Sequence, residues 1–388
     1  MMQAAGSSRP PPAQAAVRDD PYRVMLVDDS AVIRGLFARA LESDPDIKVV
    51  ASVGDGQMAI AQLSRTPVEV VVLDIEMPRM DGLTALPELI RADRQLQVVM
   101  ASTLTVKNAD VSMKALAIGA KDYIAKPSSL SALHSAEDFK RELAQKVKAL
   151  GAARRRLRGE APPRPADPRT VAERPPATAA RPAPRAIVLR AMPREIPQAI
   201  AIGSSTGGPQ ALFAVLAKLP ASVTQPIFIT QHMPATFTAI LAEHLTRMSG
   251  RPAREAVDGE QVERGRIYVA PGDFHMVVQA QGPQRVIRLT KEPPENFCRP
   301  SVDPMLRSLA AIYGARLLTL ILTGMGQDGL KGAEVVVKAG GAVVAQDEAT
   351  SVVWGMPGAV ATNGLCSAVL PLADVAPFLV RQATGALP

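Results

Sequence analysis

A serine between two glycines is the first residue with the surroundings of a nucleophile. Ser205 lies within Gly203–Ser204–Ser205–Thr206–Gly207–Gly208–Pro209, between an apolar run at 199–202 and an apolar-periodic run at 211–219. This order predicts a strand, a tight turn and a helix, and glycines two residues before and after the serine are typical of a nucleophile elbow. Backbone N–H groups at a helix start lack partners within the helix, so they could bind an oxyanion. The alternative is a loop that binds a phosphate or has no chemical role.

A serine nucleophile needs a base, and the chain has only 4 histidines. His232 follows the apolar run 226–230, a predicted buried strand, so it lies at the carboxyl end of that strand. We rank it ahead of His275, which follows a turn at 271–273 and could line a pocket. His244 lies in a helical pattern typical of a structural histidine.

The base in turn needs an orienting acid. Asp328 follows a third apolar strand at 316–323 and lies in a glycine-rich loop, although capping a helix is a common alternative role for aspartate. If the three strands are parallel, Ser205, His232 and Asp328 share the edge where open α/β sheets place their sites. The order Ser, His, Asp along the chain differs from that of the α/β-hydrolases, so we do not assign that fold.

A second group of reactive side chains lies in the first part of the chain. Asp28 and Asp29 follow a predicted strand at 23–27, and Asp74 follows a continuous β-branched run. Two further predicted strands end in Ser102 and just before Lys126. Carboxylates that meet at one sheet edge require a cation, and Mg²⁺ prefers oxygen ligands. Asp74 is therefore a plausible nucleophile towards a phosphoryl donor, with helix capping by 28–30 as the alternative.

The elements that position these residues alternate regularly. Five strand–helix units in the first domain predict one doubly wound parallel sheet. The length of 388 residues predicts two or three domains, and the hydrophobic content of 47% predicts globular ones. No apolar run approaches the roughly 20 residues of a membrane helix, so we expect no membrane insertion.

Charge and cysteine content limit the function classes. Eleven arginines and four acidic residues lie in 151–195, so this segment alone accounts for the net charge of +7. No helix-turn-helix pattern is evident, and we therefore expect a solvated basic linker and no nucleic-acid partner. Cys298 and Cys366 make neither a disulfide framework nor a metal motif, which favours a cytoplasmic location.

The first domain resembles a two-component receiver. The resemblance rests on Asp28–Asp29, on Asp74 with Met77–Pro78 and Asp81–Gly82, on Ser102, and on Lys126–Pro127. It implies a flavodoxin-like (βα)5 fold, a Mg²⁺ ion for phosphorylation and a CheA-type histidine kinase as phosphodonor. The implied roles are the phosphoacceptor for Asp74, Mg²⁺ ligands for Asp28, Asp29 and Asp74, the switch hydroxyl for Ser102, the reorienting aromatic for Tyr123 and the phosphate-contacting cation for Lys126.

The last domain resembles the CheB-type protein-glutamate methylesterases of chemotaxis, which also deamidate glutamine. The resemblance rests on the runs 202–208, 231–234, 270–276 and 322–329. It implies an α/β domain with a mainly parallel sheet, no cofactor there, and methyl-accepting chemoreceptors as substrates. The implied site is the triad Ser205, His232 and Asp328, with Thr206 and Met325 as oxyanion-hole candidates and His275 in the pocket.

Together these features predict four segments. We expect a disordered leader at 1–21, a receiver at 22–145, a Pro/Ala/Arg-rich linker at 146–195 and a catalytic domain at 196–388. The resemblance implies that the receiver covers the active-site face until Asp74 is phosphorylated. Two other classes stay open: a scaffold with an inactive hydrolase domain, and a serine hydrolase of small esters or peptide bonds.

Overall fold

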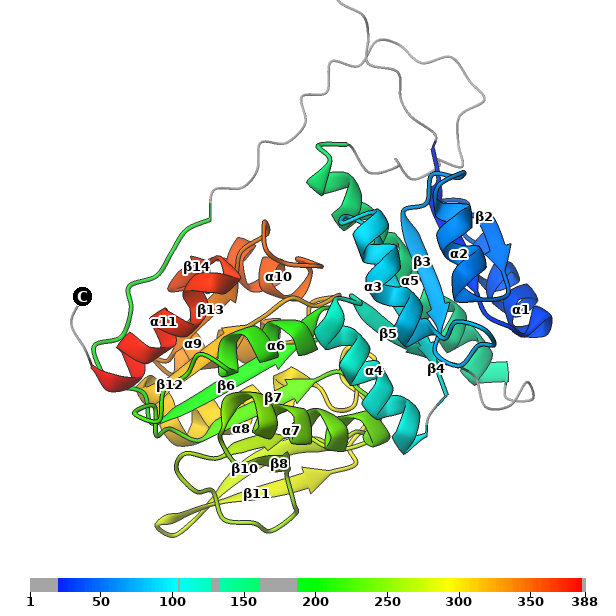
Figure 1. Cartoon of the computed structure of the whole chain (residues 1–388). Helices are drawn as coiled ribbons and strands as arrows, with labels where there is room; N and C mark the ends of the chain where they lie inside the picture. Colours follow the sequence, from blue (N-terminus) through cyan, green and yellow to red (C-terminus); the bar gives the residue numbers. More distant parts are fainter. Residues whose placement is uncertain (1–19, 104, 127–132, 161–186, 386–388) are drawn as a thin grey trace, which may run out of the picture.

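The computed structural model describes residues 20–103, 105–126, 133–160 and 187–385. It contains two α/β domains that lie against each other (Figure 1). The predicted leader, apart from its last two residues, and the central part of the predicted linker, 161–186, lie outside the described residues. Among the helices in the described ranges, none has the length and apolar composition needed to cross a membrane.

The first domain is built on a five-stranded parallel sheet in the order β2-β1-β3-β4-β5, which confirms the predicted fold. Its strands are β1 (Tyr22–Val27), β2 (Ile47–Val53), β3 (Val70–Asp74), β4 (Gln97–Ser102) and β5 (Asp122–Ala125). Its helices are α1 (Ala31–Glu42), α2 (Gly56–Leu63), α3 (Gly82–Ala92), α4 (Val106–Ile118) and α5 (Leu133–Leu157). All residues of β3 and β4 are buried, because helices cover both faces of the sheet.

Helix α5 runs past residues 145 and 146, the predicted boundary between the receiver and the linker. The helix continues to Leu157, and its arginines are not all solvated. Arg154 is buried beside Asp93, with Nη2 at 2.5 Å from Oδ2, and Arg155 is buried with Nε at 2.5 Å from Oε1 of Glu69. Asp93 and Glu69 neutralise these two arginines. The two ion pairs therefore belong to the packed receiver and add no net charge to a linker.

The second domain is built on a seven-stranded sheet in the order β14-β13-β12-β6-β7-β9-β8, in which every recorded pairing of described residues is parallel. The strands are β6 (Ala199–Ser204), β7 (Ile227–Gln231), β8 (Ala253–Glu255), β9 (Ile267–Val269), β12 (Leu317–Ile321), β13 (Ala342–Gln346) and β14 (Ala368–Leu370). A separate antiparallel pair is formed by β10 (His275–Gln281) and β11 (Gln284–Thr290).

Helices pack on both faces of this sheet (Figure 1). They are α6 (Gly208–Leu216), α7 (Ala235–Ser249), α8 (Val302–Tyr313), α9 (Leu330–Lys338), α10 (Met356–Thr362) and α11 (Leu372–Thr384), with a short 3-10 helix at Gly314–Arg316. Strand β6 lies between β12 and β7. After β6 the chain first adds β7 on one side of β6, and it later adds β12 on the other side. The loops after these three strands therefore meet at a topological switch point, where α/β sheets form their sites.

The two domains share a packed interface. Helix α4 of the receiver lies beside α6 and α7 (Figure 1). The rings of Tyr123 and Phe237 stack with centroids 4.2 Å apart and an interplanar angle of 7°. Nε2 of His244 lies 3.0 Å from Oδ1 of Asp110 across the same interface. The receiver face that carries Tyr123 is thus buried against the second domain.

Candidate active site and phosphorylation site

Ser205 follows β6 and is half-buried in a loop that neighbouring strand ends hold in place. The backbone N–H of Ser205 donates to the carbonyl of Thr323 at 3.1 Å, and the carbonyl of Ser205 accepts from Nε2 of Gln231 at 2.9 Å. A Cβ atom at Gly324 would lie 3.0 Å from Cβ of Ser205, so only glycine lets this loop approach so closely. Gly207 has φ 75°, a left-handed conformation that favours glycine. The predicted strand, tight turn and helix are therefore present.

His232 and Asp328 are brought together as predicted. They follow β7 and β12, and Nε2 of His232 lies 2.7 Å from Oδ2 of Asp328. In the part of the chain that the structure describes, no hydrogen bond joins the hydroxyl of Ser205 to the ring of His232. The ring nitrogen left for Ser205 is Nδ1, which instead lies 3.4 Å from Sγ of Cys298.

Asp328 accepts an unusually large number of hydrogen bonds. Its Oδ1 accepts from Ser301 Oγ at 2.7 Å and from Asn296 Nδ2 at 2.8 Å, and its Oδ2 accepts from the backbone N–H of Val302 at 2.6 Å. Val302 is the first residue of α8, so the N-terminus of that helix points at the carboxylate. The alternative prediction, that Asp328 serves only to cap its own helix, does not account for these long-range donors.

The donors around Asp328 set its charge state. Burial alone would raise the pKa of this carboxyl, but the hydrogen bond and the charge of His232, together with Val302 and Ser301, lower it to about 2. The carboxylate is therefore ionised at every physiological pH. It can stabilise a positive charge on the imidazole of His232.

Two backbone donors are open next to Ser205. The N–H groups of Thr206 and Met325 have no recorded acceptor among the described residues. Thr206 follows Ser205 directly, and Met325 follows Gly324, which packs on Ser205. These two N–H groups therefore remain the predicted donors of an oxyanion hole.

His275 does not fit the predicted pocket role. Its side chain is fully buried at the start of β10. Its Nδ1 accepts from the backbone N–H of Ser301 at 3.1 Å, and its Nε2 lies 3.1 Å from the carbonyl of Pro293. Both nitrogens thus contact backbone groups of the 293–301 segment, so His275 anchors the loop that carries Ser301.

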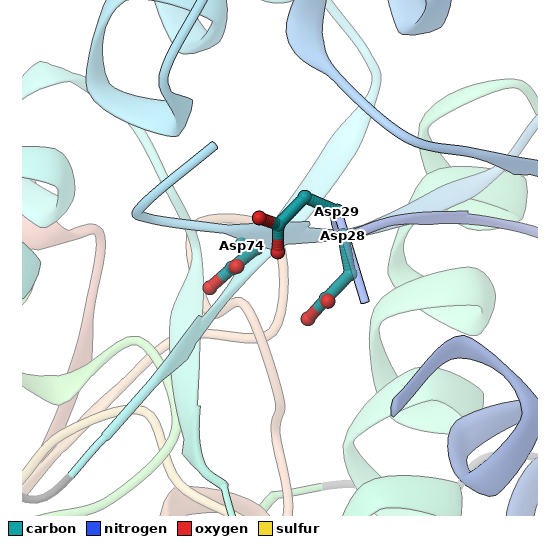
Figure 2. Close-up of side chains that lie close together, drawn as sticks. All are labelled: Asp28, Asp29 and Asp74. Carbon is teal, nitrogen blue, oxygen red and sulfur yellow. The ribbon is translucent and has the colours of Figure 1, made fainter. Parts of the chain in front are cut away.

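The receiver places its three acidic residues in one cluster (Figure 2). One carboxylate oxygen each from Asp28, Asp29 and Asp74 lies within 4.8 Å of the others. Nζ of Lys126 is 2.7 Å from Oδ2 of Asp28 and 2.6 Å from Oδ1 of Asp74. Within 28–30, Ser30 does cap α1, because its side chain accepts from the N–H of Ile33. Asp28 and Asp29 instead lie in the acidic cluster with Asp74.

The charge at this cluster favours a bound cation. The pKa of Asp74 is raised to about 6, because burial and the charge of Asp28 together outweigh the lowering by Lys126. A raised carboxyl pKa means that the anionic form lacks compensating charge. Three carboxylates with oxygen ligands suit Mg²⁺, so the residues present fit that ion.

The remaining receiver residues lie at the predicted strand ends. Ser102 is buried, and its hydroxyl donates to the carbonyl of Thr103 at 3.1 Å rather than to Asp74. Tyr123 is buried in the domain interface against Phe237. The receiver and the catalytic domain also interact at Asp122. Burial raises the pKa of Asp122, and Thr206 of the catalytic domain is among the groups that lower it.

Several functional candidates were missed by sequence reasoning. Gln231 donates a hydrogen bond to the carbonyl of Ser205. Asn296 and Ser301 donate to Asp328, and Cys298 contacts His232. Gln231 directly precedes His232, so its place at a strand end was a usable signal. The other three lie in a loop between β11 and α8, and no periodicity or spacing connects that loop with the ends of β7 and β12.

Comparisons with known proteins agree with this geometry. Residues 200–379 match the family model of CheB methylesterase, and residues 24–137 match that of the response regulator receiver domain. A protein-glutamate methylesterase/protein-glutamine glutaminase of Azospirillum brasilense is 59% identical, with 97% of this chain and 98% of that protein covered. One from Paramagnetospirillum magneticum is 60% identical over 94% of this chain and 97% of its own.

Among solved structures, the catalytic domain of Thermotoga maritima CheB methylesterase is 43% identical, covering 48% of this chain and 98% of its own, with a TM-score of 0.47. The response regulator domain of the same CheB is 34% identical, covering 34% and 96%, with a TM-score of 0.31. The full-length relatives are similar over both domains and in the same order. The chain therefore belongs to the CheB family of receiver-linked protein-glutamate methylesterases/protein-glutamine glutaminases.

Proposed function

We propose that this protein hydrolyses glutamate methyl esters on chemoreceptors in the cytoplasm, with Ser205 as nucleophile, His232 as base and Asp328 as the orienting acid. The observation that carries the assignment is the 2.7 Å contact between His232 and Asp328 beside the strand end that presents Ser205. In the reaction, Ser205 attacks the ester carbonyl, His232 takes the serine proton, and methanol leaves with that proton. Water then cleaves the acyl-enzyme and restores the serine.

The surroundings of the triad support each role. Asp328 stays ionised because its pKa is lowered to about 2, so it can stabilise the imidazolium that forms when His232 accepts the proton. The open N–H groups of Thr206 and Met325 would bind the oxyanion of the tetrahedral intermediate. A donor of this kind is worth about 3–4 kcal/mol in other serine hydrolases. The same site would release ammonia from a receptor glutamine, because the acyl-enzyme is the same.

We infer that a histidine kinase of the CheA type phosphorylates Asp74. Mg²⁺ held by Asp28, Asp29 and Asp74 would supply the charge that offsets the anionic oxygens during transfer. The phosphoryl group adds negative charge beside Lys126 and strong acceptors within reach of a reoriented Ser102. Tyr123 lies in β5 between this site and Phe237 of the catalytic domain, so rearrangement there would loosen the interface.

The receiver also touches the loops of the catalytic edge, which supports inhibition of the resting enzyme. Thr206 interacts with Asp122, and Nη1 of Arg156 lies 3.2 Å from Oε1 of Glu348. Val352 packs against the receiver core and also lies beside the Gly207 turn. We infer that these contacts keep a methylated receptor helix from Ser205 until they are released.

The test is methanol release from membranes that carry methylated receptor. Ser205→Ala should abolish release, while Ser249→Ala, which removes a hydroxyl bonded to the carbonyl of Leu245 in α7, should not. A fluorophosphonate probe should label the wild-type chain and not Ser205→Ala. Labelling without methanol release, but with cleavage of small esters, would instead favour a general esterase. No labelling at all would favour a scaffold.

A further inference from the structure

A short turn places a thiol against the base. The backbone N–H of Cys298 donates to the carbonyl of Glu295 at 2.9 Å, and the N–H of Glu295 donates back at 3.2 Å. The two residues between them, Asn296 and Phe297, have φ of 53° and 63°. These left-handed values close a tight turn, and a bulky residue such as Phe297 adopts them only when its surroundings impose them.

Contacts with the catalytic domain hold this turn. Nδ2 of Asn296 donates to Oδ1 of Asp328 at 2.8 Å and to Oδ2 of Asp303 at 2.9 Å. Nη1 of Arg307 donates to Oε2 of Glu295 at 2.9 Å. The position of Sγ of Cys298 is therefore tied to the same carboxylate that orients the base.

The thiol contacts the one ring nitrogen of His232 that Ser205 needs. Asp328 occupies Nε2, so proton transfer from Ser205 must use Nδ1, and Sγ of Cys298 lies 3.4 Å from Nδ1. Ser205 and Cys298 therefore compete for a single nitrogen. In the arrangement seen here, with the receiver docked, Cys298 occupies it.

The receiver contacts the same turn. The guanidinium carbon of Arg141 in α5 lies 5.3 Å from the ring centroid of Phe297, the residue next to Cys298. The ring of Phe297 is otherwise exposed, at 89%. Movement of α5 would therefore act directly on the residue beside the thiol.

We propose that Cys298 is a positioning residue that holds the catalytic nitrogen of His232 away from Ser205 in the receiver-docked enzyme. The proposal rests on the role of His232 given above. It assigns a function to a residue outside the triad and outside the receiver.

The protonation of His232 follows from this contact. Burial lowers the pKa of the imidazole, but the interaction with Cys298 and the hydrogen bonds to Asp328 and Cys298 outweigh it and raise the pKa to about 10. A protonated ring cannot accept the proton of Ser205. The ionisable groups nearby are Cys298 and Asp328 in contact with the ring, and Asp303, Glu295 and Arg307 around Asp328.

The test is the pH dependence of kcat/KM for methanol release by the unphosphorylated full chain. Cys298→Ala and Cys298→Ser should shift the acidic limb of the profile to lower pH, by about one pH unit or more, because neither variant keeps the sulfur contact with Nδ1 of His232. At pH 7 this raises kcat/KM by about tenfold or more. Cys366→Ala is the matched control and should keep the wild-type profile, since Cys366 is fully buried away from His232.

A second measurement does not depend on activity. The chain has only 4 histidines, so the ring nitrogens of His232 can be assigned by NMR and titrated in the wild type and in both Cys298 variants. The pKa of His232 should be lower in the variants. Identical titrations together with identical acidic limbs would overturn the proposal. His232→Gln separates the two hypotheses: an active variant refutes His232 as the base, whereas an inactive one leaves only the role of Cys298 in question.

Discussion

Two aspartates of this chain occupy equivalent places and have opposite electrostatics. Asp74 ends β3 of the receiver and Asp328 follows β12 of the catalytic domain, and both are buried at the carboxyl edge of a parallel sheet. The pKa of Asp74 is raised to about 6, mainly by burial, whereas that of Asp328 is lowered to about 2 by its donors despite burial.

The difference comes from what surrounds each carboxylate. Asp74 has the ammonium of Lys126 and the backbone N–H of Ile75, but a second carboxylate, Asp28, shares the same lysine. Asp328 has Asn296, Ser301, His232 and the N-terminus of α8. A carboxylate with too little compensating charge suits a group that is modified by phosphoryl transfer and assisted by a cation. A buried carboxylate whose oxygens are fully hydrogen-bonded suits a permanent counter-charge.

The largest effect is expected for Asp328→Asn. The amide keeps the shape but removes the charge that stabilises protonated His232, so kcat for methanol release should fall by about 10³–10⁴-fold. The matched substitution Asp347→Asn removes a carboxylate that contacts Thr350 in another loop and should cost little. A loss below tenfold for Asp328→Asn would mean that Asp328 serves folding rather than catalysis.

For Asp74→Asn we expect loss of regulation. The variant should no longer respond to a small phosphodonor such as acetyl phosphate, because the acceptor oxygen is gone. EDTA should likewise suppress the response of the wild type if Asp28, Asp29 and Asp74 bind Mg²⁺. Stimulation that persists in Asp74→Asn would place the phosphoacceptor elsewhere.

The two aspartates should also affect stability in opposite directions. Because the pKa of Asp74 rises from 3.8 to about 6 on folding, the folded chain binds more protons in that window, and the free energy of unfolding falls as pH rises through it. Asp74→Asn should therefore stabilise the receiver at pH 7 by about 1–3 kcal/mol and have less effect at pH 4. The contribution of Asp328 is present above pH 3.8 and is lost as pH falls towards 2.

Urea unfolding of Asp74→Asn and Asp328→Asn at pH 4 and pH 7, followed separately in each domain, measures whether each substitution raises or lowers the free energy of unfolding. Destabilisation of the receiver by Asp74→Asn at pH 7 would contradict the raised pKa. Destabilisation of the catalytic domain by Asp328→Asn is expected at pH 7, since the donors around the carboxylate lose a charged partner.

The smallest effect is expected for Ser301→Ala. It removes one of the donors to Oδ1 of Asp328, which costs about 1–2 kcal/mol of stability and lowers activity a few-fold. Ser308→Ala, within α8, removes a hydroxyl that donates to the carbonyl of Met305 and accepts from the N–H of Val278, and it provides the comparison. If activity falls equally in both variants, Ser301 acts through α8 and not through Asp328.

Much of the fold was predictable from hydrophobic pattern. The runs before Asp28, Asp74, Ser205 and His232 are short, apolar and followed by turn residues, and each is a strand in the structure. The end of the receiver was not predictable, because Arg154 and Arg155 look like part of a basic linker until Asp93 and Glu69 are placed beside them. The sequence shows that an arginine is charged, but it does not show which carboxylate pairs with that arginine in the folded chain.

The sequence by itself determined which side chains meet at each sheet edge, because parallel strands align their carboxyl ends whatever the details of packing. That regularity predicted the acidic cluster of the receiver and the convergence of Ser205, His232 and Asp328. Only the tertiary structure decided that Asp328 binds Nε2 of His232, that Cys298 lies against Nδ1, and that His275 is an anchor. These contacts come from the irregular 293–301 segment, whose path depends on long-range packing rather than on any repeating local pattern.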